Sequence, residues 1–167
     1  MIRTALLSAA LILSTPALAA LSPADTTMVG AVDAAFDADV ALLERMVNQN
    51  SGTNNIEGVT KVAEMLRPEL EALGFKVRWI PQGEVQRAGH LFAEHKGKPG
   101  GKRLLLIGHL DTVFEPDSPF QRFTREGDIA KGPGVADNKG GVVVMLSALK
   151  AMKAAGTLKD ANIVVAL

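Results

Sequence analysis

The sequence predicts an α/β fold in which a sheet is covered by helices on both faces. Three observations support this class. Helical and strand-like patterns follow one another in the order helix, helix, strand, strand, strand, helix, strand. Two short apolar runs, Leu104–Ile107 and Ile163–Ala166, are typical of buried strands. Polar residues that can carry chemistry follow the first run directly, at the sheet edge where α/β proteins bind ligands.

The first 19 residues have the pattern of a secretory signal peptide. Arg3 gives a positive start, Ala5–Leu13 form an apolar stretch, and Ala17-Leu18-Ala19 is a small-residue cleavage site. The apolar stretch is too short to span a bilayer, and no later stretch is long enough. Pro16 argues against an uncleaved anchor helix. We therefore predict cleavage after Ala19 and a periplasmic or secreted protein.

Residues 20–167 have the size and composition of one ordinary domain. The chain is 47% hydrophobic and 22% charged, with 18 basic and 18 acidic residues. This balance gives no electrostatic reason to expect nucleic acid or an anionic membrane as a partner. The chain has no cysteine, so metal ligands would have to be His, Asp or Glu.

Three stretches have the three- and four-residue spacing of apolar residues that predicts amphipathic helices. They are residues 33–47, 57–73 and 140–155. Pro68 should kink or split the second helix, and Gly74 should end it as a carboxyl-terminal cap.

Four further stretches are predicted as strands: residues 76–80, 89–95, 103–108 and 162–167. We expect the second and third of these to pair through the turn at Pro99-Gly100-Gly101. Residues 114–128 form a long loop with little pattern, and long loops over a site are often functional. The last strand has the character of a central strand, yet no element follows to cover it. The α/β pattern therefore predicts a truncated domain.

The stretch Arg103–Gly141 concentrates the residues that can carry chemistry. His109 and Asp111 leave the same face of an extended chain, so one can bind a cation while the other holds the imidazole tautomer. Asp137 lies among glycines that leave room for an ion, and its two oxygens can bridge two cations. Ordinary roles also fit, because His-x-Asp is a common tripeptide and a lone Asp in a glycine-rich loop is usually a turn former. The spacing alone leaves a metal site and a structural role equally open.

Other candidates are weaker. His90 and His95 fit surface or strand positions better than metal binding. Lys139 is expected to be solvated, as a lysine in a loop usually is. Three phenylalanines near the motifs are expected to pack in the interior rather than to line a cleft: Phe114, Phe120 and Phe123.

Two motifs taken together resemble the zinc peptidases of the M20 family. They are Gly-His-Leu-Asp-Thr-Val at residues 108–113 and Gly-Pro-Gly-Val-Ala-Asp-Asn-Lys-Gly-Gly at residues 132–141. Ser51-Gly52-Thr53 and Leu73-Gly74-Phe75 also fit. Within the family, the chain resembles the exported glutamate carboxypeptidases. The resemblance covers residues 20–167 but only the first part of such an enzyme. It implies a zinc-dependent exopeptidase-like catalytic domain in truncated form.

By this resemblance, His109 is a ligand of one zinc ion and Asp137 bridges two. Asp111 is the catalytic-site residue that orients His109, and the Asp137–Asn138 peptide is expected to be cis. The general base, the remaining metal ligands and a dimerisation domain of such enzymes lie beyond Leu167. The chain alone is therefore expected to be inactive, and its full-length form to be a homodimer. Sites of this kind also accept Co or Mn.

The predicted function is hydrolysis of a peptide or amide bond next to a C-terminal residue, with glutamate as one candidate. The substrate would be a small peptide or an N-acyl amino acid. Three alternatives remain open: a deacylase of N-acyl amino acids, which shares every motif, a non-catalytic binding module, and a truncation product without function. Glu-Glu a few residues beyond Leu167 in a longer reading frame would favour the enzyme.

Overall fold

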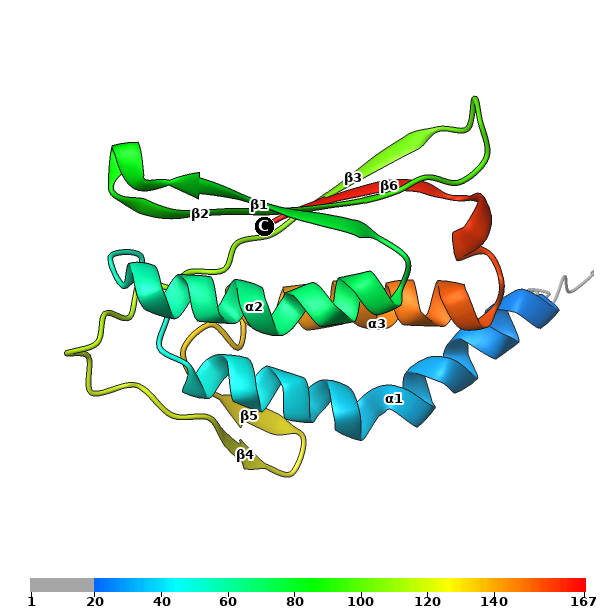
Figure 1. The fold of residues 1–167 in the computed structure, drawn as a ribbon. Coiled ribbons are helices and arrows are strands. Elements are labelled where there is room, and N and C mark those ends of the chain that lie inside the picture. Colours follow the sequence, from blue (N-terminus) through cyan, green and yellow to red (C-terminus); the bar gives the residue numbers. More distant parts are fainter. Residues whose placement is uncertain (1–19) are drawn as a thin grey trace, which may run out of the picture.

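The structure, a computed structural model, describes residues 20–167 (Figure 1). The predicted signal peptide, residues 1–19, lies outside the described residues. The helices are α1 (Pro23–Asn48), α2 (Ile56–Ala72) and α3 (Lys139–Ala154). The strands are β1 (Lys76–Gln82), β2 (Arg87–His95), β3 (Arg103–Ile107), β4 (Thr124–Glu126), β5 (Ile129–Lys131) and β6 (Asn162–Ala166). Two short 3-10 helices, η1 (Gly83–Val85) and η2 (Leu158–Asp160), complete the described elements.

Helix α1 begins at Pro23 rather than at residue 33, because a capping box starts it. The Ser22 hydroxyl accepts a hydrogen bond from the Asp25 backbone N–H at 3.2 Å, and the Asp25 carboxylate accepts one from the Ser22 backbone N–H at 3.2 Å. Pro23 follows at the first helical position, where its missing N–H costs nothing. Val29, in the added part, and Phe36, in the predicted part, are both exposed.

Helix α2 agrees with the predicted helix but continues through Pro68 as one element of 17 residues. The predicted split is therefore wrong. Proline removes one helical hydrogen bond, yet Leu66 and Leu70 on either side of it are both buried in the core. Burial of this apolar face stabilises a helix more than local propensity does. Gly74 follows the helix with a φ of +90°, as expected of a carboxyl-terminal cap.

The main sheet has the strand order β1-β2-β6-β3. Strand β6 pairs antiparallel with β2 and parallel with β3, with Leu105 opposite Val164. The predicted central position of the last strand is therefore confirmed. The predicted pairing of β2 with β3 is wrong, because β6 lies between them. The two strands are neighbours in sequence, but β6 brings its own apolar side chains to the middle of the sheet.

All three described helices lie on the same side of the sheet (Figure 1). The buried side chains of the two inner strands point to this side: Leu91, Ala93, Ile163 and Val165. The α/β class is confirmed, and a helical cover on the second face stays a prediction. Strand β3 is an edge strand rather than a buried one, since Leu105 is 57% and Ile107 72% exposed.

Strands β4 and β5 form a separate antiparallel hairpin. Strand β4 lies within residues 114–128, which are predicted as a loop, and β5 follows directly after them. Each strand has three residues, too few for an alternating pattern to stand out. None of the helices in residues 20–167 has both the length and the apolar character needed to cross a membrane.

Candidate metal centre

The candidate site lies where β3 ends, at the carboxyl edge of the parallel β3–β6 pair. Gly108 leaves the strand, and a Cβ atom there would lie 2.9 Å from both the Asn138 Oδ1 and the Leu167 Cδ2 atoms. Glycine therefore lets the side chains of the loop before α3 approach this strand end closely, and a larger residue would displace them. The next apolar residue, Leu110, is buried. It anchors the loop, and His109 and Asp111 on either side of it remain partly exposed.

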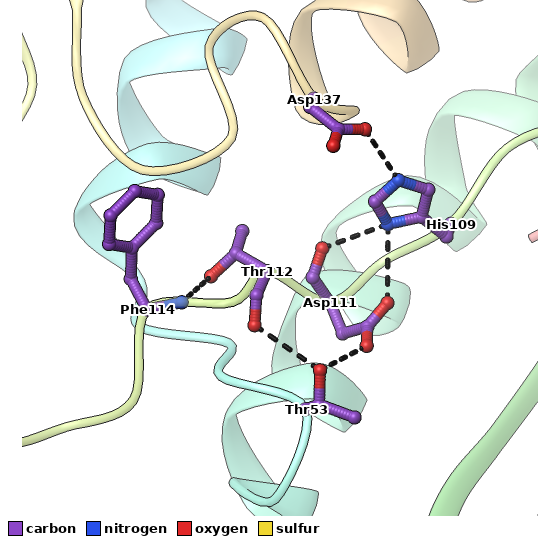
Figure 2. Close-up of polar contacts among 6 residues, drawn as sticks. All are labelled: Thr53, His109, Asp111, Thr112, Phe114 and Asp137. Atoms are coloured by element: carbon purple, nitrogen blue, oxygen red, sulfur yellow. Dashed lines mark hydrogen bonds and ion pairs between the residues drawn. The ribbon is translucent and has the colours of Figure 1, made fainter.

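Both ring nitrogens of His109 face acidic residues (Figure 2). The Nδ1 atom lies 3.0 Å from the backbone oxygen of Asp111 and 3.2 Å from its Oδ1 atom. The Nε2 atom lies 2.8 Å from the Asp137 Oδ1 atom. A neutral imidazole has one N–H and can donate to only one side. The contact on the other side therefore requires a second proton or a cation between nitrogen and carboxylate.

The charge state of His109 follows from the same contacts. Burial lowers the pKa of His109, but the hydrogen bonds to Asp137 and Asp111 and their negative charges outweigh this effect and raise the pKa above its usual value. The Asp137 side chain is 84% exposed, whereas that of Asp111 is 33% exposed. Asp137 therefore has an oxygen open to solvent beside the ring, while Asp111 lies behind it.

Asp137 is held by a glycine-rich loop that runs into α3. Gly134 has a φ of +80°, in the left-handed region that favours glycine. A Cβ atom on Gly140 would lie 2.1 Å from the Val135 backbone oxygen, so that position also requires glycine. The Asp137–Asn138 peptide is cis, as expected.

Lys139 is fully buried, so the expectation that it is solvated is wrong. Its ammonium donates hydrogen bonds to the backbone oxygens of Met46 at 2.8 Å and Gln49 at 3.0 Å. These carbonyls end α1, where helices attract positive charge. Burial lowers the pKa of Lys139 to about 8. The lysine thus ties the residue after the Asp137–Asn138 peptide to the end of α1, and nothing in the local sequence pattern signals this contact.

The loop between α1 and α2 forms another wall of the site. Residue 52 forms a parallel bridge with Thr112, and the Thr53 hydroxyl donates to the Asp111 Oδ2 atom at 2.6 Å (Figure 2). Glu115 accepts hydrogen bonds from the backbone and side-chain nitrogens of Asn54 at 3.1 and 3.0 Å. Sequence reasoning noted Thr53 only as part of a motif and missed its contact with Asp111.

A pocket of about 310 Å³ opens in front of these groups. His109, Asp111 and Asp137 line it, together with Phe114 and Phe120. The rings of the two phenylalanines meet edge to face with centroids 5.1 Å apart, and Phe120 is 42% exposed. The expectation of interior packing is therefore wrong for these two residues.

His90 and His95 do not contact His109 or Asp137. His90 is exposed on β2, where it lines a neighbouring pocket together with Thr53 and Asp111. The Nδ1 atom of His95 lies 2.9 Å from the Ala161 backbone oxygen, and its ring packs against Phe75.

The donor atoms of His109 and Asp137 are of the types that zinc binds, but they are fewer than a zinc site needs. Zinc binds imidazole nitrogen and carboxylate oxygen, and these are the atoms that meet between His109 and Asp137. A catalytic zinc needs about three protein ligands. Within residues 20–167, no group of three or more His, Cys, Asp or Glu side chains is placed to hold a metal ion. The two residues therefore fit as one part of a metal site.

The described residues form part of an α/β domain with a candidate metal site, and comparisons with known proteins show which family it resembles. Residues 105–167 match the model of peptidase family M20/M25/M40. Carboxypeptidase G2 from Pseudomonas sp. (strain RS-16) is 39% identical over 121 residues, which cover 70% of this chain and 28% of that protein. Succinyl-diaminopimelate desuccinylase from Novosphingobium aromaticivorans is 33% identical over 126 residues, covering 71% and 32% of the two chains. The resemblance to the M20 family is confirmed.

Solved structures support the same fold. An M20 family metallo-carboxypeptidase from Sulfolobus solfataricus superposes with a TM-score of 0.64 at 25% identity and covers 77% of this chain and 30% of that one. A di-peptidase from Saccharomyces cerevisiae has a TM-score of 0.69 at 18% identity, covering 84% and 33%. The present chain spans about a third or less of the length of these relatives.

Proposed function

We propose that this chain is the amino-terminal part of a zinc-dependent hydrolase that cleaves a peptide or amide bond next to a C-terminal residue. One observation carries the proposal: both nitrogens of His109 face acidic residues, although a neutral imidazole has a single N–H. A zinc ion on the Nε2 side would satisfy both contacts with the ring in its neutral form. The motif resemblance and the two curated relatives support the same reading.

In this proposal, His109 and Asp137 hold the metal and Asp111 holds His109. The Nδ1–H is shared between the backbone oxygen of Asp111 at 3.0 Å and its Oδ1 atom at 3.2 Å, so the lone pair of Nε2 is free for the metal. Asp137 is exposed enough to use its second oxygen for a second ion. When bound, zinc polarises the scissile carbonyl and lowers the pKa of water. The remaining ligands and the carboxylate base are expected in sequence beyond Leu167, so residues 20–167 alone should bind zinc weakly and lack activity.

A deacylase of N-acyl amino acids is the second candidate. It is favoured by the relative that is named a desuccinylase, at 33% identity. The relative named a carboxypeptidase, at 39% identity, favours a peptide or a glutamate-terminated substrate. Both reactions break an amide bond, so His109, Asp111 and Asp137 would have the same roles in each.

The test uses the product of the longest reading frame that contains this chain, called here the full-length protein. We expect two zinc ions per chain by elemental analysis, and hydrolysis of an N-acyl glutamate, a dipeptide or an N-succinyl amino acid. His109→Ala should lose at least one ion and nearly all activity. His95→Ala is the matched control, since His95 pairs with Ile163 at the opposite end of β6 from the site, and it should keep both zinc ions and activity. Unchanged zinc content in His109→Ala would show that the site is misassigned.

A further inference from the structure

We propose that Thr53 is a positioning residue of this site: its hydroxyl fixes the carboxylate of Asp111, which in turn fixes the ring of His109. The inference rests on the proposed function, because it gives His109 a metal to bind. It adds Thr53, from the loop between α1 and α2, to the residues that hold the proposed metal ligand His109.

The contacts form an unbroken chain (Figure 2). The Thr53 Oγ1 atom lies 2.6 Å from the Asp111 Oδ2 atom and 3.3 Å from the Thr112 backbone oxygen. A hydroxyl has one proton to donate, and 2.6 Å is the length expected of an O–H bond to a carboxylate. The proton therefore goes to Asp111. The other oxygen of Asp111, Oδ1, faces the Nδ1 atom of His109 at 3.2 Å and shares its N–H with the Asp111 backbone oxygen at 3.0 Å. Each carboxylate oxygen thus has one neighbour, and Oδ1 adds to a backbone contact that already fixes the ring.

The backbone of Thr53 is held independently of its hydroxyl. The Thr53 N–H donates to the Thr112 backbone oxygen at 3.0 Å, and the Thr112 N–H donates to the Ser51 backbone oxygen at 2.8 Å. Glu115 holds the next residue, Asn54, by two further hydrogen bonds. Removal of the hydroxyl should therefore leave the loop in place and free only the carboxylate.

A free Asp111 would no longer hold one orientation. Its side chain is 33% exposed, so water would replace Thr53 at Oδ2 and the carboxylate would rotate more easily. The N–H of His109 would then be less firmly kept on Nδ1, and Nε2 would spend less time as a metal-binding lone pair. Loss of such outer contacts typically lowers metal affinity about 10- to 100-fold.

Two variants of the full-length protein separate positioning from simple loop stability. Thr53→Val keeps the branched shape and removes the hydroxyl, whereas Thr53→Ser keeps the hydroxyl. We expect the zinc dissociation constant of Thr53→Val, measured by chelator competition, to rise about 10-fold, the lower end of that range. Thr53→Ser should stay within about twofold of the original protein. At saturating zinc, kcat should fall in Thr53→Val while KM changes little.

Nitrogen-15 NMR of the histidine side chains gives a readout independent of activity. The chain has three histidines, and His109→Ala assigns the signal of interest. In the zinc-loaded protein, the Nδ1–H signal of His109 should be sharp with Thr or Ser at position 53 and exchange-broadened in Thr53→Val. His95, which lies beside Ala161 and Phe75 away from position 53, serves as internal reference.

Equal zinc affinity and equal Nδ1–H signals in Thr53→Val and Thr53→Ser would overturn the role of Thr53. If zinc still binds and His109→Ala abolishes it, the proposed function stands without Thr53. If the full-length protein binds no zinc, both proposals fail.

Discussion

At the scale of single residues, the two carboxylates beside His109 differ in their surroundings. Asp111 contacts Nδ1 and is partly enclosed, while Asp137 contacts Nε2 and is mostly exposed. The enclosed carboxylate is suited to holding the ring, and the exposed one is suited to holding an ion.

The first prediction follows from this difference. In the full-length protein, Asp111→Asn should keep near-normal zinc at saturating metal but lose about 10- to 100-fold in zinc affinity or turnover. Asp137→Asn should lose at least one zinc ion and nearly all activity, because in the proposed function the negative charge of Asp137 holds the two zinc ions together. Zinc stoichiometry and hydrolysis of an N-acyl glutamate measure both. An empty site in Asp111→Asn beside two retained ions in Asp137→Asn would reverse the assignment.

Lys139 gives a prediction on pH and stability. Its pKa is about 8 in the folded chain, against about 10.4 for a lysine in an unfolded chain. Between these values the unfolded chain binds more protons, so folding becomes more favourable as pH rises. Without zinc, the unfolding free energy of the original protein should therefore rise relative to Lys139→Met from pH 8 to pH 9.5. Urea titration at each pH measures the difference, and a constant difference would contradict the buried position.

The sequence predicts three residues of the candidate site but not the two that contact them or their loop. His109, Asp111 and Asp137 are candidates because of their residue types and spacing, and the motif resemblance implies their roles. The roles of Thr53 and Lys139 are not predicted, because they depend on contacts across 58 and 93 residues of sequence. A local pattern carries no information on such distant partners.

At the scale of elements, Lys150 joins all three helices. From α3 it reaches the Asp39 Oδ1 atom on α1 at 3.1 Å and the Glu69 Oε2 atom on α2 at 2.9 Å. The side chain of Asp39 is 9% exposed, so loss of its partner would leave a nearly buried negative charge.

The second prediction on stability tests this junction. Lys150→Met should lower the unfolding free energy by about 2 kcal/mol, less than for a fully buried pair because Lys150 still reaches water. Lys61→Met, which removes an exposed pair with Glu57 on α2, should have no measurable effect. Urea unfolding of the two variants compares them, and equal losses would show that the junction adds nothing.

Helices and strands were predicted best where apolar residues recur at regular spacing along the chain. Helices α2 and α3 repeat apolar residues on one face and were found almost to their ends. Strand order was not predicted, because pairing of β6 between β2 and β3 depends on which apolar surfaces meet in three dimensions. The start of α1 was missed because Ser22 and Asp25 cap it ahead of the apolar repeat.

At the scale of the whole molecule, the predicted signal peptide can be tested directly. Expression in a bacterium should give periplasmic protein that begins at Ala20, since Ala17-Leu18-Ala19 fits a cleavage site. Intact-mass analysis of the periplasmic fraction measures the start, with an Ala17→Arg, Ala19→Arg double variant as the uncleaved control. Protein that keeps Met1 in the cytosol would refute export.

Strand β3 has a consequence for how residues 20–167 behave in solution. One edge of the strand is unpaired in the described residues, and the face that carries Leu105 and Ile107 is open to solvent. A flat, apolar edge of this kind is a template for strands of other molecules. We therefore expect the isolated chain to form oligomers as its concentration rises, detectable by light scattering. Leu105→Lys, which puts a charge on the open face, should keep it monomeric to higher concentration.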